Sequence, residues 1–297
     1  MNKRIELMIK DMRDFSERTG LKKAVIGISG GKDSTIVAKL AIDALGKDNV
    51  LGVTMPKDKS DICESQYEIA NWMGLRMIKV PIEDPYLYIV SDAQKGLYGK
   101  DLIKGDVDLK MAGINLQPRL RMSTLYYIGR VMNAFVLNTS NFDERLVGYS
   151  TIWGDDVGDY GPLNYLHVSE VKQLGYDLGI PAEFVDIPPS DGLSGKTDEE
   201  AMGFTYQEVE EVAEKFYTCY RRPVSGHRVF DEEMWPETVV VGEDRDKALE
   251  AKPINLTGHE LAIVKMHNKN LFKYNSVMIA CYGPWIEDHP QYKNKEE

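Results

Sequence analysis

Apolar positions in the first eighty residues of the chain switch between two periods. Ala24–Ile28, Val50–Thr54 and Met77–Pro81 are short apolar runs, which are typical of buried strands. Asp33–Leu45 and Ser60–Met73 lie between them and repeat apolar side chains every three or four positions, as helices do. This order of strands and helices predicts an α/β fold, a doubly wound parallel sheet with right-handed crossovers and helices on both faces.

The remaining patterned segments extend the same scheme. Met1–Phe15 predicts an amphipathic helix, Arg119–Val131 and Val168–Leu178 predict two more helices, and Ala134–Asn138 predicts a further buried strand. In the helix expected at residues 60–73, Ser60 is the predicted N-cap.

Two stretches lack a clear period. Residues 93–114 are rich in Gly, Lys and Asp, which favours a long mobile loop or a small subdomain. Residues 221–256 combine Pro, Gly and many charges, and predict an excursion between two C-terminal helices. We therefore expect one domain over residues 1–297, with elaborations at about 93–114 and 221–256.

The first strand ends in the sequence SGGKDS at residues 29–34, and a helix is expected directly after it. A strand, a glycine turn and a helix in this order place backbone N–H groups and the positive end of the helix dipole around one point. Lys32 adds a positive charge, and the carboxylate of Asp33 can hold a divalent cation. The pattern predicts a phosphate-binding loop, and an ordinary tight turn is the alternative.

A second group of polar residues follows the strand expected at 134–138. Because parallel strands end at one edge of a sheet, Thr139 and Glu144 should lie on the same rim as the glycine loop. Glu144 is a candidate second ligand for the cation held by Asp33, and Thr139 can hydrogen-bond a nucleotide. Capping of the next helix by Ser140 or Asn141 explains part of this segment equally well.

Three further segments carry polar residues. Arg119 and Arg121 stand at the start of an expected helix, where they are either ligands or surface cations. Residues 148–159 are dense in Gly and Asp and predict a turn-rich loop, but they lack the ligand spacing of a calcium loop. Residues 188–206 join a rigid Pro-Pro to a flexible Gly-rich stretch, which suits either a lid or a plain linker.

Taken in order, these segments resemble the ammonia-dependent NAD synthetases. SGGKDS is similar to the loop of ATP pyrophosphatases in general. NLQPRLRM at 115–122, GYSTIWGD at 148–155 and PPSDGLSGKTDEEAMGF at 188–204 are more specific. The resemblance implies a fold like that of the adenine-nucleotide alpha-hydrolases, a homodimer, and three small-molecule substrates: nicotinic acid adenine dinucleotide, ATP and ammonia.

The resemblance also implies roles for single residues. Asp33 and Glu144 would hold Mg²⁺, and Lys32 and Asp33 would act in catalysis. Arg119, Asp159 and Lys273 would bind the dinucleotide. The residues implied for ATP binding are Gly27, Ile28, Ser29, Gly30, Gly31, Lys32, Asp33, Ser34, Thr139 and Ser190.

This chain departs from the family pattern at three positions where many members have lysine: Ile152, Val168 and Ile187. Two alternatives to NAD synthesis follow from the sequence. One is another ATP pyrophosphatase, such as a GMP synthetase or a tRNA-thiolating enzyme. The other is a protein that binds a nucleotide without turnover.

Composition narrows the choice of partners and location. The formal net charge of −11 argues against a nucleic-acid surface, because phosphate backbones bind basic faces. The three cysteines lie far apart, which is typical of free thiols in a reducing compartment. No apolar stretch approaches a membrane span, so we expect a cytoplasmic protein with no membrane partner.

No segment is left for a glutamine amidase, so free ammonia is the expected nitrogen donor.

Overall fold

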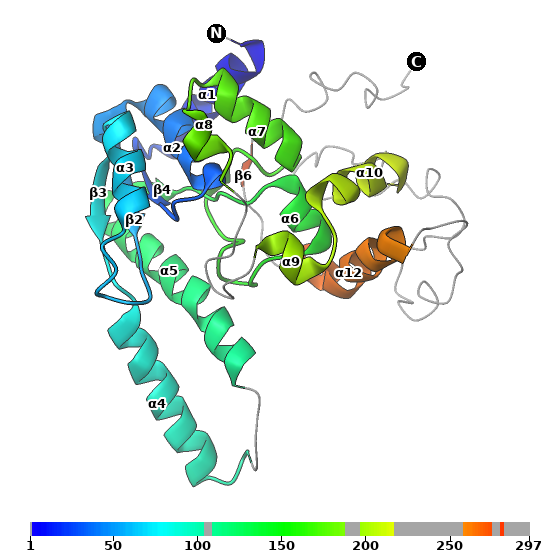
Figure 1. Ribbon diagram of the computed structural model, residues 1–297. Helices are drawn as coiled ribbons and strands as arrows, with labels where there is room; N and C mark the ends of the chain where they lie inside the picture. The colour runs from blue at the N-terminus through cyan, green and yellow to red at the C-terminus, as the bar shows by residue number, and fades with distance from the viewer. Residues whose placement is uncertain (1, 104–108, 188–196, 217–257, 275–279, 282–297) are drawn as a thin grey trace.

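A parallel sheet forms the centre of the molecule (Figure 1). The computed structural model describes residues 2–103, 109–187, 197–216, 258–274 and 280–281. The four strands of this sheet are β1 (Lys23–Gly27), β2 (Val50–Thr54), β3 (Arg76–Lys79) and β4 (Ala134–Val136), in the order β3-β2-β1-β4. All three neighbouring pairs are parallel, as the sequence predicted.

Helices cover both faces of this sheet. The helices α1 (Lys3–Thr19), α2 (Lys32–Leu45) and α3 (Glu64–Met73) pack on one face, and α5 (Lys110–Met132) packs on the other. Ala24 and Ile26 of β1 join the core under α1 and α2, while Val25 between them joins the core under α5. Alternation of side chains along a strand divides the apolar residues of β1 between two cores. The doubly wound arrangement expected from the sequence is confirmed.

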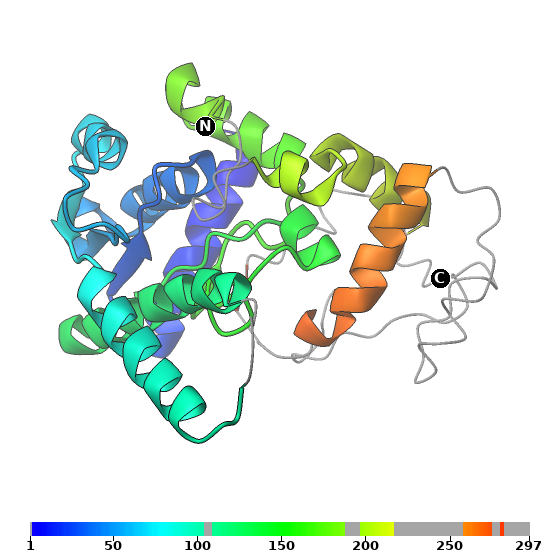
Figure 2. The ribbon, with the colours of Figure 1, turned by 60° about the horizontal axis from the view of Figure 1, so that its bottom comes forward.

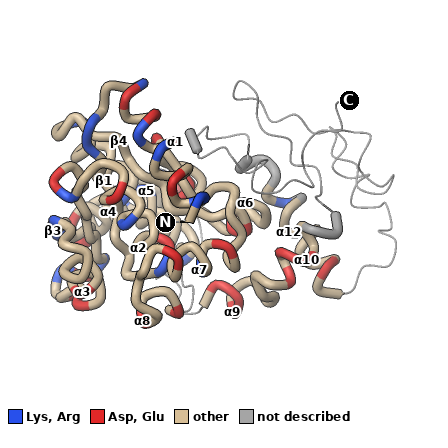
Figure 3. The backbone as a smooth tube through the Cα atoms, turned by 90° about the horizontal axis from the view of Figure 1, so that it is seen from above, with Lys and Arg blue, Asp and Glu red and all other residues tan. Residues whose placement is uncertain are grey.

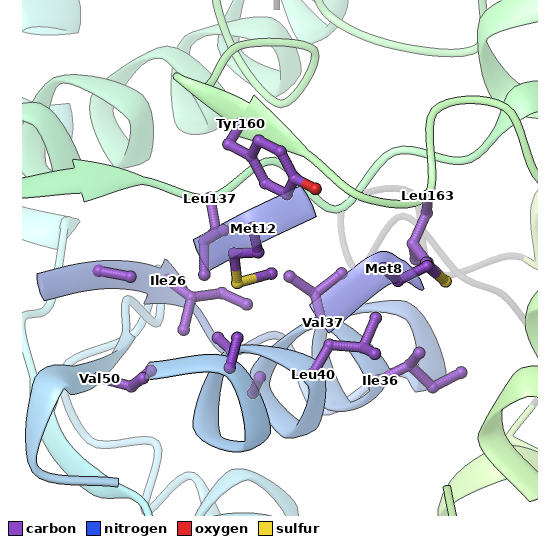
Figure 4. Packing of buried hydrophobic residues seen from close by; sticks show 14 of the residues in the cluster. Met8, Met12, Ile26, Ile36, Val37, Leu40, Val50, Leu137, Tyr160 and Leu163 are labelled. Carbon is purple, nitrogen blue, oxygen red and sulfur yellow. The ribbon is translucent and has the colours of Figure 1, made fainter. Parts of the chain in front are cut away.

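The larger core lies between α1, α2 and the sheet. Figure 4 shows Met8 and Met12 of α1 packed near Ile26 of the sheet and Leu40 of α2. All four side chains are almost fully buried. Burial of side chains of this size contributes about 1.5–3 kcal/mol each, so this core fixes α2, and with it the loop that precedes α2.

The direction of winding reverses between β1 and β4. From β1 the chain adds β2 and β3 on one side, and then returns through α4 (Glu83–Gly99) and α5 to place β4 on the other side of β1. Loops that follow β1 and β4 therefore diverge at the same edge of the sheet. Ligands in open α/β sheets bind at such a reversal.

A second, smaller core joins segments that are far apart in the sequence. It packs α6 (Phe142–Val147), α10 (Tyr206–Phe216) and α12 (Gly258–Tyr274) around Leu146, Val209 and Ile263. The short α9 (Asp198–Met202) leads into α10, and Phe204 between them is buried in the same core. Figures 1 and 2 show these helices to one side of the sheet. We refer to α6, α9, α10 and α12 as the helical cluster.

Residues 93–114, expected to form a long mobile loop or a small subdomain, are helical at both ends. Residues 93–99 complete α4, and residues 110–114 begin α5; residues 104–108 between them lie outside the described chain. Figure 1 shows α4 and the start of α5 extending away from the sheet. No described residue of α4 is buried, which is consistent with a helix that extends away from the core.

Two expected helix starts are also corrected. α5 begins at Lys110, so Arg119 and Arg121 lie inside this helix and not at its start. α3 begins at Glu64 rather than after Ser60, because the backbone N–H and hydroxyl of Ser60 both donate to Asp58 Oδ1, at 2.8 and 2.6 Å. This local side-chain bond holds Ser60 in a turn.

The remaining described elements are a one-turn 3-10 helix η1 (Lys47–Asn49), the helices α7 (Val168–Asp177) and α8 (Ala182–Val185), and the short parallel pair β5 (Tyr160–Gly161) and β6 (Ala280–Cys281). The excursion expected at 221–256 lies outside the described residues. None of the described helices combines the length and the apolar character that crossing a membrane requires.

Candidate functional site

A cavity of about 720 Å³ opens at the edge of the sheet where β1 and β4 end. Its walls include the loop after β1, the loop after β2, the loop after β4 and the cavity-facing side of α5. This volume lies within the range of small-molecule sites. Every residue of the predicted loop from Gly27 to Ser34 lines it.

Hydrogen bonds within the glycine loop fix its shape. Ser34 Oγ donates to the carbonyl of Gly31 and lies 3.1 Å from Ser29 Oγ, while the N–H of Gly31 donates to Ser29 Oγ. Gly30 has φ +91°, and a Cβ there would stand 2.9 Å from Ser65 Oγ, so only glycine fits. The loop therefore turns tightly into the N-terminus of α2, which is the geometry that binds phosphate.

Helix α3 supports this loop from outside. Gln66 Nε2 donates to the carbonyl of Ser29 at 2.9 Å, and both Ser65 and Gln66 line the cavity. Sequence reasoning missed this support, because a glutamine on an exposed helix carries no recognisable signal.

Lys32 and Asp33 form a close ion pair at the start of α2. Lys32 Nζ lies 2.8 Å from Asp33 Oδ2, and the Lys32 side chain is only 4% exposed. Burial alone would lower the pKa of Lys32, but the neighbouring Asp33, with smaller contributions from Glu144 and Asp198, raises it overall. Lys32 therefore stays charged in the cavity wall.

Glu144 lies opposite this pair, at the start of α6. It is the third residue of a capping box: its backbone N–H donates to Asn141 Oδ1, and its carboxylate accepts from the N–H of Asn141. Burial, then the charge of Asp33, raise the pKa of Glu144 well above its usual range, while Lys32 opposes them. Glu144 thus caps α6 and also lines the cavity in which it is predicted to be a ligand.

The carboxylates fit a divalent cation. Asp33 Oδ1 is buried and has no hydrogen-bond partner within the described chain, which leaves it available as a ligand. Glu144 and Asp198 line the same cavity and act on each other by charge. Carboxylate oxygens are the ligands that Mg²⁺ prefers.

A more compact group of possible ligands lies elsewhere. In the part of the chain that the structure describes, one group of at least three such residues, Asp143, His167 and Glu210, has ligand atoms within 4.8 Å of one another. Its atoms are already used: Asp143 bonds His167 Nδ1 and the N–H of Val168, at 2.6 and 2.7 Å, and Glu210 accepts both the N–H and the hydroxyl of Ser169. This group therefore anchors the start of α7.

Thr139 and two of the residues expected to bind the dinucleotide are described. Thr139 lines the cavity. Arg119 does not, but its Nε donates to the carbonyl of Ile152, and the preceding Pro118 does line it. Asp159 accepts hydrogen bonds from the N–H of Val136 and the hydroxyl of Tyr126, at 2.8 and 3.3 Å, and lies outside the cavity lining.

The remaining predicted residues fall partly outside the described chain. Ser190 lies outside the described residues, as does most of the expected lid. Lys273 falls in the last turn of α12, and its side chain is not described. Of the three positions where the family pattern has lysine, Ile187 lines the cavity, whereas Ile152 and Val168 do not.

Arg121, which the sequence left open as a ligand or a surface cation, is a further positive charge in the cavity wall. Its Nε donates to the carbonyl of Met55 at 3.1 Å, and its side chain lines the cavity. Burial lowers the pKa of Arg121, and the charge of Asp155 opposes this. The sequence indicated this segment as a candidate for binding, since it contains both Arg119 and Arg121. It did not show which of the two arginines faces the cavity.

A phosphate-binding glycine loop at the reversal of an open α/β sheet, with carboxylates beside it, defines a nucleotide-binding protein with the means to hold a cation. Comparison with known proteins then narrows the class. The model of the NAD synthase family matches residues 4–239, and the chain belongs to this family.

Individual relatives support membership of the NAD synthase family. The NH(3)-dependent NAD(+) synthetase of Methanococcus aeolicus is 39% identical over 64% of this chain and 73% of that protein. The corresponding protein of Finegoldia magna is 38% identical over 69% of this chain and 81% of that protein. Among solved structures, the NMN synthetase from Francisella tularensis has a TM-score of 0.67 and 25% identity, covering 91% of this chain and 94% of that one. The family, the fold and the ligase class expected from the sequence are confirmed, and the family uses ATP.

Proposed function

We propose that this chain amidates nicotinic acid adenine dinucleotide to NAD with ammonia, coupled to cleavage of ATP into AMP and pyrophosphate. The observation that carries the proposal is one cavity in which the loop Gly27–Ser34, Thr139 and Glu144 meet. Relatives named NH(3)-dependent NAD(+) synthetase support the choice of reaction.

The glycine loop would bind the phosphates of ATP. Its N–H groups and the N-terminus of α2 favour negative charge, and the buried ammonium of Lys32 adds a full positive charge at the same place. These groups bind the pyrophosphate more strongly as it leaves and gains charge, so they lower the barrier as well as binding ATP. Ser190, outside the described residues, is a further proposed ATP contact.

Asp33 and Glu144 would hold Mg²⁺, which would supply neutralising charge to the phosphates. The two carboxylates come from different helices, so a cation between them would join the start of α2 to the start of α6. Asp33 Oδ1 supports this assignment, because the described residues leave it buried and without a hydrogen bond.

A carboxylate is a poor acceptor for ammonia, so the reaction needs two steps. One oxygen of the nicotinate carboxylate attacks the α-phosphorus of ATP, and the bond to pyrophosphate breaks. Ammonia then attacks the carboxyl carbon, loses a proton, and displaces AMP, which carries the attacking oxygen with it. Arg119, Asp159 and Lys273 are the proposed contacts of the dinucleotide.

An isotope experiment tests the reaction. Dinucleotide labelled with ¹⁸O in the nicotinate carboxylate, with ATP, ammonium and Mg²⁺, should yield NAD, AMP and pyrophosphate in equal amounts, with one ¹⁸O in AMP. Nicotinic acid mononucleotide is the competing substrate to include, because a similar structure is named an NMN synthetase. Tight ATP binding with no AMP from either substrate would favour a binding protein without turnover.

The nitrogen donor is tested in the same assay. Free ammonia is the proposed donor, so glutamine freed of ammonium should support little turnover. Rates with glutamine equal to those with ammonium would contradict this part of the proposal.

A homodimer and a cytoplasmic location remain predictions, as does a single domain over residues 1–297. Exposed apolar side chains on α4 and α5, including Tyr88 and Tyr127, each 72% exposed, supply a surface that a second copy would cover. Light scattering at micromolar concentration should give twice the chain mass, and Tyr127→Glu should shift the mass toward the monomer.

A further inference from the structure

Asp198 brings the helical cluster into the phosphate site. It is the first residue of α9, it is 5% exposed, and it lines the same cavity as Lys32, Asp33 and Glu144. Its carboxylate lies far from the glycine loop in sequence, yet its charge acts on both Lys32 and Glu144. The sequence placed it only within a candidate lid.

Several hydrogen bonds hold Asp198 in this position. The hydroxyl of Tyr206 donates to Asp198 Oδ2 at 3.1 Å, and the N–H of Tyr206 donates to Glu199 at 3.0 Å. A capping box between Thr197 and Glu200 fixes the start of α9. Burial, then the charge of Glu144, raise the pKa of Tyr206, so its hydroxyl remains a donor.

Asp33, Glu144 and Asp198 are not among the described groups whose ligand atoms all lie within 4.8 Å of one another. The interaction of Asp198 with Lys32 and Glu144 is one of charge. The negative charge of Asp198 is one of the causes that raise the pKa of Glu144, and a divalent cation bound at the site would offset that charge.

We propose that Asp198, held by Tyr206, is a positioning residue that makes nucleotide binding depend on a divalent cation. Its carboxylate attracts the cation to the site of Asp33 and Glu144, and it repels nucleotide phosphates when no cation is bound. The inference rests on the proposed function for the metal, and it adds α9 and α10 to the elements that control the site.

The two effects of this charge have opposite signs. Asp198→Asn removes one negative charge and keeps the size of the side chain. It should weaken Mn²⁺ binding about tenfold in the presence of α,β-methylene ATP, which cannot be cleaved between those phosphates. It should also strengthen binding of the same nucleotide in EDTA several-fold. A purely structural role would weaken both.

Two further variants sharpen the test. Tyr206→Phe keeps the charge but removes the hydrogen bond, so Mn²⁺ affinity should fall about threefold, with no gain in nucleotide affinity in EDTA. Glu211→Gln on the exposed side of α10 removes the same charge outside the cavity lining and should change neither affinity. Mn²⁺ binding is followed by electron paramagnetic resonance, and nucleotide binding by calorimetry.

Unchanged affinities in Asp198→Asn, or losses of both, overturn the inference. If Asp198→Asn does not fold, Tyr206→Phe decides, and an unchanged Mn²⁺ affinity is then the contrary result. The proposed function fails separately, through absence of NAD formation by the unaltered chain, because neither binding measurement depends on turnover.

Discussion

The sheet and the helical cluster contribute to the site in different ways. The sheet edge supplies the glycine loop, Lys32 and Asp33 within a few consecutive residues. The helical cluster supplies Glu144 and Asp198, and it is held together by contacts such as that of His267 Nδ1 with the carbonyl of Leu146, 121 residues away. Figure 3 shows acidic residues spread over α7, α8, α9 and α10.

The residues proposed to bind phosphate are local to one strand, turn and helix, whereas the cation site also needs residues from the helical cluster. A strand, turn and helix form a phosphate loop wherever their local sequence allows it. Two of the three carboxylates of the proposed cation site, Glu144 and Asp198, come from the helical cluster, so this site is complete only when the cluster is packed against the sheet. Substitutions that destabilise the helical cluster should therefore lower the affinity for the cation before they lower the affinity of the glycine loop for phosphate.

The largest effect is expected from Asp33→Ala. Loss of this carboxylate removes the proposed cation ligand on the sheet side, and kcat should fall about a hundred- to a thousandfold. Asp43→Asn, on the same helix and paired at the surface with Lys39, is the matched control and should keep the normal rate. A normal rate for Asp33→Ala at saturating Mg²⁺ contradicts the assigned role.

Gly148→Ala should come next, and it tests the cluster. Gly148 has φ +65°, and a Cβ there would lie 2.4 Å from Asn270 Cβ of α12, so the change combines backbone strain with displacement of α12. We expect a loss of about 2–4 kcal/mol in the free energy of unfolding. Urea titration measures it.

Gly179→Ala controls for the strain alone. Gly179 also has a positive φ, of +72°, but a Cβ there meets no atom within 4 Å. This variant should lose only about 1 kcal/mol. Equal losses in the two variants would show that the contact of α6 with α12 does not stabilise the cluster.

The pair His167–Asp143, which joins α7 to the cluster, should make stability depend on pH. Burial opposes the charged imidazole, but the hydrogen bond and charge of Asp143 outweigh it and raise the pKa of His167. A raised folded-state pKa stabilises the protein below the unfolded value of about 6.5, and this stabilisation is lost as pH rises through the folded value.

Unfolding titrations at about pH 6 and about pH 8.5 check this dependence. The unaltered chain should lose more stability between these pH values than His167→Gln does, by on the order of 1 kcal/mol. An equal pH dependence in both proteins would remove the role of this pair.

The smallest effect concerns Ile187, which lines the cavity in place of a family lysine. Ile187→Lys should strengthen ATP binding about two- to fivefold, because a partly solvated cation adds little energy. Ile152→Lys, outside the cavity lining, should leave the affinity unchanged. Calorimetry that finds the reverse order would show that the cavity wall differs in the complex.

The sequence by itself determined the sheet, the glycine loop and the family. Residues 24–45 are sufficient to predict the loop, because an apolar run, two glycines and an amphipathic helix follow one another there. Glu144 was also predictable, since parallel strands end at one edge and so bring the residues after β1 and β4 together.

Only the tertiary structure decided the helical hairpin, the position of Arg121 and the part played by Asp198. α4 carries no buried residue, so no contact with the core reveals its place in the fold from the sequence. Arg121 faces the cavity because α5 packs against the sheet through Leu120, Leu125 and Ile128, and this packing sets the rotation of the helix about its axis. Asp198 reaches Lys32 and Glu144 through Tyr206 and the packing of α6, α10 and α12. Periodicity reports which face of an element is apolar, whereas the meeting of charges from distant segments is fixed by how those faces pack.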